Sequence, residues 1–131
     1  MRILIVEDDF TSRMFMRKFL SKYGECDVAV DGIEAIDAYI SSLNEGHPYN
    51  LICLDIMMPR LDGISALKSI RELEKKKSIT IAKRVKIIIT TSMKENEIDM
   101  SVFDSEFETV AYKPIKADKF ADVMKNLGLI E

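Results

Sequence analysis

Runs of apolar residues alternate with amphipathic segments along this chain. Three of the runs, at 2–6, 50–54 and 85–90, are mostly apolar, as expected for strands that are buried on both faces of a parallel sheet. Two more, at 26–30 and 109–112, mix apolar and polar residues and suit the edges of the sheet. Because helix-like segments separate the strands, the pattern predicts an α/β fold with helices on both faces of a parallel sheet.

The first two helices have clear ends in the sequence. The segment near 9–23 places its apolar side chains on one broad face and stops at Gly24, which is predicted to be a left-handed cap. The next helix begins with the pattern Asp31-Gly32-Ile33-Glu34, which resembles a capping box, and ends at Gly46.

Three more helices are predicted in the second half of the chain. One starts near Asp62 and another spans about 94–103. The stretch 74–82 between them has no clear period and is expected to be a loop or a frayed helix end. The last helix has apolar residues spaced at i, i+3, i+4 and i+7, namely Phe120, Val123, Met124 and Leu127.

Length and composition suit one globular domain, which we expect to span residues 1–131. The net charge of −3 gives no general attraction to nucleic acid or to an anionic membrane. No membrane span or signal peptide is predicted, so we expect a cytoplasmic protein that binds neither nucleic acid nor a membrane. Cys26 and Cys53 do not suggest a metal or redox pair, and Cys53 is expected to be a small core residue.

Charged and hydroxyl side chains follow four of the predicted strands. Glu7 and Asp8 follow the first strand, Asp55 the third, Thr90-Thr91-Ser92 the fourth and Lys113 the fifth. In a right-handed parallel sheet these strand ends gather on one edge, where such folds bind ligands. Carboxylates suit a hard divalent cation, while a lysine and a hydroxyl suit phosphate oxygens. The sequence therefore predicts a metal-assisted phosphoryl site.

Each of these residues also has a simpler interpretation. An isolated Asp55 would be an acid that caps a turn, and Glu7 and Asp8 would favour a helix N-terminus by about 0.3–1 kcal/mol. Lys113 would be a solvated residue before a proline, and the threonines would reflect strand propensity. We favour the functional interpretation because like charges that meet at one edge need a cation.

Together these motifs resemble the receiver domain of two-component response regulators, in particular its single-domain, chemotaxis-type members. The resemblance covers nearly the whole chain and implies a three-layer (βα)5 flavodoxin-like fold with strand order 2-1-3-4-5. It rests on Val6-Glu7-Asp8-Asp9, on Leu54-Asp55-Ile56-Met57-Met58-Pro59 with Asp62-Gly63, on Thr91, and on Lys113-Pro114, a bond that the family typically holds cis.

The resemblance implies a role for each residue at this edge. Asp55 would be the phosphoacceptor, which receives its phosphoryl group from a histidine kinase or a phosphotransfer protein. The reaction would need Mg²⁺, with Mn²⁺ as an alternative. Asp8 and Asp55 would bind the metal directly, Glu7 through water and Met57 through its backbone carbonyl, whereas Asp9 would only start a helix.

The resemblance also implies a switch. Thr91 and Lys113 would contact the new phosphate and shift the surface formed by the helix near 94–103, the last strand and the last helix. Many receivers pair the hydroxyl with an aromatic residue, but Val110 stands at that position here and Tyr112 follows on the same strand face. Val110 and Tyr112 are therefore the candidates for the secondary switch.

Two further segments depart from the family pattern. The connection before the fourth strand is long and basic, and a solvated charged loop is the expected interpretation, ahead of a kinase or nucleic-acid contact. Its cations are Lys75, Lys76, Lys77, Lys83, Arg84 and Lys86. In addition, Ser105-Glu106-Phe107-Glu108 replaces the glycine-containing turn that is usual before the last strand.

Our leading hypothesis is a stand-alone phosphoacceptor switch that signals by binding an unidentified protein target, because the chain ends about one helix after Lys113. It would catalyse only its own phosphorylation and dephosphorylation. One alternative is a phosphatase or phosphotransferase with an aspartyl-phosphate intermediate. Another is a protein-interaction module with the receiver fold that phosphorylation does not regulate.

Overall fold

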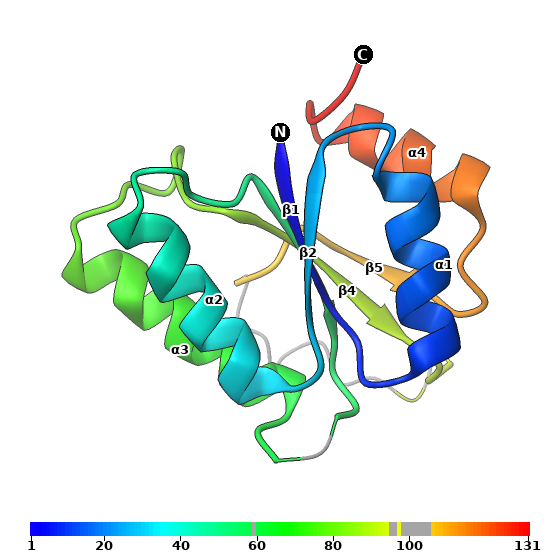
Figure 1. Cartoon of the computed structure of the whole chain (residues 1–131), viewed down its shortest axis with the longest axis horizontal. Coiled ribbons are helices and arrows are strands. Elements are labelled where there is room, and N and C mark those ends of the chain that lie inside the picture. Colours follow the sequence, from blue (N-terminus) through cyan, green and yellow to red (C-terminus); the bar gives the residue numbers. More distant parts are fainter. Residues whose placement is uncertain (59, 95–96, 98–105) are drawn as a thin grey trace.

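The fold is built on a single five-stranded parallel sheet, seen in a computed structural model that describes residues 1–58, 60–94, 97 and 106–131 (Figure 1). The strand order is β2-β1-β3-β4-β5, as the resemblance implied. The three central strands are the mostly apolar ones, and the two mixed strands form the edges. The strands are β1 (Arg2–Val6), β2 (Glu25–Ala29), β3 (Leu51–Asp55), β4 (Lys86–Thr91) and β5 (Thr109–Tyr112).

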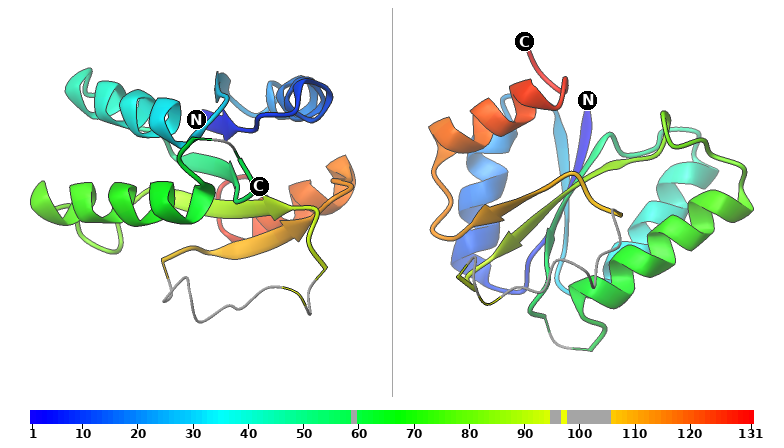
Figure 2. Two further views of the ribbon diagram at one scale, coloured as in Figure 1. Left: turned by 90° about the horizontal axis from the view of Figure 1, so that it is seen from below. Right: turned by 180° about the vertical axis from the view of Figure 1, so that it is seen from behind.

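Helices cover both faces of this sheet, which gives the predicted three layers (Figures 1 and 2). Helices α2 (Gly32–Asn44) and α3 (Gly63–Lys76) pack on one face, while α1 (Phe10–Leu20) and α4 (Ala117–Asn126) pack on the other. The helix predicted near 94–103 falls outside the described residues, apart from 94 and 97. Within the described residues no helix is long and apolar enough to cross a membrane.

Each face of the sheet has its own apolar core. Leu4, Leu54 and Ile89 pack under α2 and α3. On the other face, Ile5 and Ile88 lie with the buried thiols of Cys26 and Cys53 under α1 and α4. Burial raises the pKa of both thiols. The two cysteines thus belong to the core and form no pair, as the sequence predicted.

Aspartates start three of the helices, which fixes how the chain leaves the strand ends. Asp9, Asp31 and Asp62 each accept a hydrogen bond from the backbone N–H three residues later, at 2.8 or 2.9 Å. The predicted starts of α1, α2 and α3 are therefore confirmed. Glu34 completes the second cap by accepting a hydrogen bond from the backbone of Val30.

The prediction that Gly24 is a left-handed cap is wrong. Helix α1 ends at Leu20, and the glycines with positive φ angles are Gly46 and Gly128. A side chain at Gly24 would place its Cβ 2.2 Å from the backbone oxygen of Met1, so glycine is needed here for close approach rather than for handedness. Gly46 follows α2 with φ 73°, as expected for a helix terminator.

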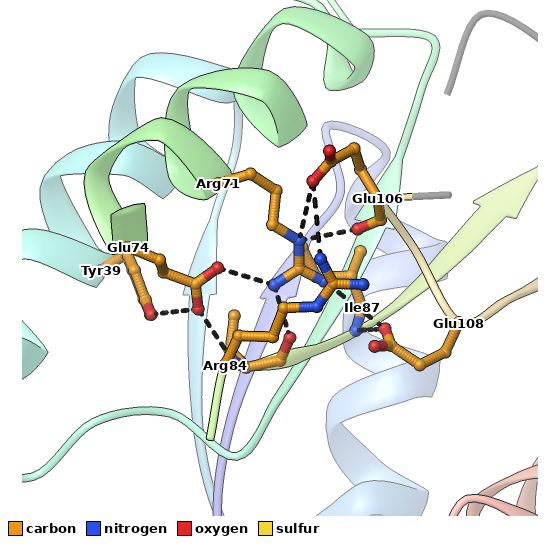
Figure 3. Close-up of polar contacts among 8 residues, drawn as sticks. Tyr39, Arg71, Glu74, Arg84, Ile87, Glu106 and Glu108 are labelled. Carbon is orange, nitrogen blue, oxygen red and sulfur yellow. Dashed lines mark hydrogen bonds and ion pairs between the residues drawn. The ribbon is translucent and has the colours of Figure 1, made fainter. Parts of the chain in front are cut away.

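A buried polar network joins α2, α3 and β4 to the approach to β5 (Figure 3). Arg71 is only 3% exposed and donates to the Glu74 carboxylate, to the Val85 oxygen and to the Glu106 oxygen, at 2.7–2.8 Å. Glu74 in turn accepts from the Tyr39 hydroxyl and from the Val85 N–H, both at 2.8 Å. The network therefore satisfies buried backbone groups at the edge where β4 begins.

Candidate functional site at the carboxyl edge of the sheet

Strand pairing brings the predicted site residues to one edge of the sheet. Val6 pairs with Leu54, so Glu7, which follows β1, and Asp55, the last residue of β3, lie at the same level on neighbouring strands. Asp55 pairs with Thr90 on β4, and Thr91 pairs with Tyr112 on β5, directly before Lys113. The topology, rather than the sequence spacing, makes these residues neighbours.

Three carboxylates converge at this edge. One oxygen from each of Glu7, Asp8 and Asp55 lies within 4.8 Å of the other two. Glu7 and Asp55 are 3% and 4% exposed, whereas Asp8 is exposed, so the cluster opens to solvent on the Asp8 side. Oxygens this close can share the ligand sphere of one small cation.

Lys113 is the cation that the protein itself provides for this cluster. Its ammonium donates to Glu7 Oε1 at 2.5 Å and to Asp55 Oδ2 at 3.2 Å. Its backbone N–H donates to the Thr91 oxygen at 2.7 Å, and the Lys113–Pro114 peptide bond is cis, as expected. Lys113 is therefore placed beside the Asp55 oxygen by both its main chain and its side chain.

The carboxylates are still crowded despite this lysine. Burial and the adjacent Asp55 carboxyl raise the pKa of Glu7 to about 7, although Lys113 opposes that shift. Burial alone would lower the pKa of Lys113, but its bond to Glu7 and the Asp55 charge outweigh burial, and the net shift is upward. One ammonium does not balance three acids, which is the condition that favours a bound divalent cation.

The loop after β3 fixes the orientation of Asp55. Its Oδ1 accepts a hydrogen bond from the Met57 N–H at 2.9 Å, so the turn-capping role considered from the sequence exists together with the clustering. Gly63 packs against this loop, where an added Cβ would lie 2.3 Å from the Asp55 backbone oxygen. The glycine after Asp62 therefore lets α3 begin directly against the acid-bearing loop.

The two threonines face opposite sides of the sheet. Thr90 lines a cavity of about 330 Å³ together with Glu7, Lys113 and apolar residues of α1. Thr91 is fully buried, and its Oγ1 accepts from the Met93 N–H at 3.1 Å. In the part of the chain that the structure describes, neither hydroxyl is bonded to Asp55.

The two candidates for the secondary switch lie beside Thr91. Val110 is half-buried and packs against the core under α2 and α3. Tyr112 is 37% exposed and pairs with Thr91 across the strands. Tyr112 is thus the strand partner of Thr91, whereas Val110 pairs with Ile89, and the part of both residues in a switch stays a prediction.

Arg13 is a site residue that the sequence reasoning missed. From the first turn of α1 it donates to the backbone oxygens of Glu7, at 3.0 Å, and of Asp8, at 3.4 Å. It therefore holds the acid-bearing loop from outside. The sequence feature that could have indicated Arg13 is its position in the first turn of the helix that follows three consecutive acids.

The donor set suits Mg²⁺. Glu7 Oε2 is buried and has no hydrogen-bond partner among the described residues, which leaves an oxygen that a cation could satisfy. All the side-chain ligands are carboxylates, which a hard divalent cation prefers to nitrogen or sulfur. The Met57 backbone oxygen, at the exposed residue two positions after Asp55, would be the additional ligand.

Comparison with known families agrees with this geometry. Residues 3–125 match the response regulator receiver domain. The chain belongs to that family. It is consequently a signalling domain of two-component phosphorelay systems, of the kind whose members accept phosphoryl groups.

Its relatives include both short and very long proteins. The chain is 29% identical to the chemotaxis protein CheY of Bacillus subtilis, with 94% of this chain and 93% of CheY covered. It is 34% identical to the hybrid signal transduction histidine kinase L of Dictyostelium discoideum over 97% of this chain. That match spans only 7% of the kinase, so the receiver corresponds to a small part of the longer protein.

Solved receiver structures share the fold. The response regulator TrrA of Thermotoga maritima, in complex with Mg²⁺ and beryllofluoride, is 28% identical with a TM-score of 0.75, covering 96% of this chain and 97% of TrrA. The Ssk1 receiver domain of Saccharomyces cerevisiae, solved with the histidine phosphotransfer protein Ypd1, is 25% identical with a TM-score of 0.80. Its match covers 98% of this chain and 88% of the solved chain.

The raised pKa of Glu7 predicts that stability depends on pH. A pKa of about 7 in the folded state, against an ordinary 4.5, means that folding favours the proton. This contribution is complete below about pH 4.5 and is lost as the pH rises through 7. In metal-free protein, we expect Glu7→Gln to raise the free energy of unfolding at pH 8 by about 1–3 kcal/mol and to change it little at pH 5.

Urea unfolding in the presence of EDTA at the two pH values measures this difference. Glu72→Gln, at an exposed position on α3, is the matched control. Its difference from wild type in the free energy of unfolding should be the same at both pH values. A Glu7→Gln protein less stable than wild type at pH 8 would contradict the proposed crowding.

Proposed function

We propose that Asp55 is the phosphoacceptor of this receiver and that Mg²⁺ binds beside it. The observation that supports this assignment most is the convergence of the Glu7, Asp8 and Asp55 oxygens within 4.8 Å, with the Lys113 ammonium on Asp55 Oδ2. Asp8 and Asp55 would bind the ion directly, Glu7 through water, and Met57 through its backbone oxygen. Mn²⁺, also a hard divalent ion, is an alternative.

Asp55, Lys113 and Arg13 would have different roles in phosphoryl transfer. An Asp55 carboxylate oxygen attacks phosphorus in line, and the bond from phosphorus to the leaving group of the donor breaks. Lys113, already on Asp55 Oδ2, neutralises charge on the transferring group, and Arg13 keeps the Glu7 and Asp8 backbone in place. A bound Mg²⁺ supplies further neutralisation of the phosphoryl oxygens.

The phosphoryl donor in this proposal is a histidine kinase or a histidine phosphotransfer protein. The solved complex of the similar Ssk1 receiver with the phosphotransfer protein Ypd1 supports that class of partner. Near Asp55, α1 offers Phe10, Met14 and Phe15, which are 66%, 50% and 43% exposed. Apolar side chains exposed together beside an acidic site are typical of a protein contact.

The phosphorylated state would act through a change of surface. Thr91 and Lys113 would contact the phosphate, and the main-chain bond between them would couple the ends of β4 and β5. The surface that changes is formed by the predicted helix near 94–103, β5 and α4, and its target is a downstream protein. Val110 and Tyr112 would then repack beside Thr91.

Direct phosphorylation tests the proposal. Incubation with phosphoramidate and Mg²⁺ should add the mass of one phosphoryl group, and EDTA should prevent the addition. Protein that stays unmodified and binds no Mg²⁺ at millimolar concentration would favour an interaction module that phosphorylation does not regulate. Repeated turnover of an external phosphate ester would favour a phosphatase or phosphotransferase.

The threonines provide a matched pair for testing the switch. We expect Thr91→Ala to leave phosphorylation of Asp55 intact but to remove most of the change in NMR chemical shifts at β5 and α4 caused by beryllofluoride. Thr90→Ala, one residue earlier and on the opposite face, should keep that change. The reverse result would assign the switch to Thr90.

A further inference from the structure

The basic connection between α3 and β4 has no role in the phosphoryl site. Residues 75–86 hold five lysines, one arginine and no acid, in a chain whose net charge is −3. The connection runs along the edge where the strands begin (Figure 1), which is the edge opposite Asp55. Arg84 contacts Glu106 at 3.6 Å, but none of the five lysines forms an ion pair with any described residue.

Two of these lysines, Lys83 and Lys86, line a groove with an apolar floor. A cavity of about 520 Å³ lies between the connection, the loop before β3 and the residues after α4. Leu43, Ile79, Ala82, Val85 and Leu129 contribute apolar surface, while Lys83 and Lys86 contribute charge. Ile81, at the same connection, is 80% exposed.

The walls of the groove are fixed, although the sequence suggested a solvated loop. The Ile79 N–H donates to the Glu74 oxygen at 2.9 Å, and the Lys86 N–H donates to the Asn50 oxygen at 3.2 Å. The buried network in Figure 3 holds Val85 at both its N–H and its oxygen, through Glu74 and Arg71. A groove that is held in this way requires little ordering when a ligand binds.

We propose that this groove binds an acidic segment of a partner protein that also carries an apolar side chain. The apolar floor would take the aliphatic or aromatic side chain, and the lysines on the rim would pair with carboxylates on either side of it. Both ionic and apolar contacts would contribute to binding, because an acidic segment without an apolar side chain would leave the floor of the groove unfilled.

The same features disfavour nucleic acid as the occupant. The aromatic residues along the groove, Tyr39 and Tyr49, are 1% and 5% exposed, so they offer no platform on which a base could stack. The negative net charge adds no attraction for phosphates beyond this patch.

Because the groove and Asp55 lie at opposite edges of the sheet, the acidic segment and a phosphoryl donor can bind at once. The contact would therefore not depend on phosphorylation. It would hold the receiver near a partner while Asp55 is phosphorylated and dephosphorylated. This role is separate from the proposed function of Asp55, and each can fail without the other.

Fluorescence anisotropy on the full chain tests the proposal, with a fluorescein-labelled peptide of alternating glutamate and leucine as the probe. We expect saturable binding that weakens with salt and is unchanged by Asp55→Asn. Lys83→Glu with Lys86→Glu should weaken binding at least about tenfold. The matched control, Lys18→Glu with Lys125→Glu, has the same charge change at exposed positions on α1 and α4 and should stay within about twofold.

Two further variants keep the test decisive. Lys75→Glu with Lys77→Glu alters only exposed positions at the end of α3 and should also weaken binding. This variant serves as a second test if the Lys83→Glu, Lys86→Glu protein, which changes a residue of β4, folds poorly. Ala82→Phe fills the groove without a change of charge and should reduce binding of the peptide. Equal losses in the control variant, equal binding of a glutamine-for-glutamate peptide, or tighter binding of a single-stranded oligonucleotide would overturn the proposal.

Discussion

Asp55→Asn is expected to abolish phosphoryl incorporation from phosphoramidate in the presence of Mg²⁺, with no modified protein detectable by intact mass spectrometry. The amide has nearly the shape of the carboxylate and can still accept the hydrogen bond from the Met57 N–H, so the loop should keep its conformation. What the variant lacks is the proposed charged nucleophile and one of the proposed metal ligands. The loss of phosphorylation should therefore come from the missing carboxylate and not from a change in the fold.

Asp9→Asn is the matched control for this experiment. It replaces an acid only two residues after Glu7, at the cap of α1, where asparagine is an equally good N-cap. We expect it to be phosphorylated at close to the wild-type rate. Unchanged modification of the Asp55→Asn protein would show that another residue accepts the phosphoryl group and would refute the assignment.

The largest expected effect on stability comes from Arg71. Arg71→Leu should lower the free energy of unfolding by about 3–5 kcal/mol, because it leaves the Glu74 carboxylate buried without its cation. It also removes the donors to the Val85 and Glu106 oxygens, which lie just before β4 and before β5. Urea unfolding monitored by circular dichroism measures the change.

Two variants of the same helix serve as comparisons. Lys68→Leu has the same kind of change at an exposed position of α3 and should alter stability by no more than about 0.5 kcal/mol. Arg71→Lys keeps the charge but lacks the planar guanidinium group that donates to several oxygens. We expect an intermediate decrease in the free energy of unfolding. An Arg71→Leu protein as stable as wild type would mean that the buried network adds nothing to folding.

The fold and the residues that meet at the carboxyl edge were predictable because they follow from local patterns. Apolar runs that end in acids identify both the strands and the edge to which Glu7 and Asp55 belong. Parallel topology then brings these ends together without any knowledge of side-chain contacts. The edge positions of β2 and β5 were likewise visible in their mixed composition.

Features that depend on close approach were not predictable in this way. Gly24 was assigned a left-handed conformation, whereas contact with the Met1 backbone is what requires it. Arg71 and Glu74 continue the helical spacing of Leu67 and Ile70, so the sequence placed two charges on the apolar face of α3. Their partners come from β4 and from the approach to β5, which no local pattern could indicate.

The burial of both thiols has a practical consequence for labelling studies. Because Cys26 and Cys53 lie inside the folded core and their pKa values are raised, little thiolate is present at neutral pH to react with maleimides or oxidants. A cysteine introduced on the surface would therefore be the reactive one. Fluorophores or spin labels could then be attached at a chosen position without removing the native cysteines.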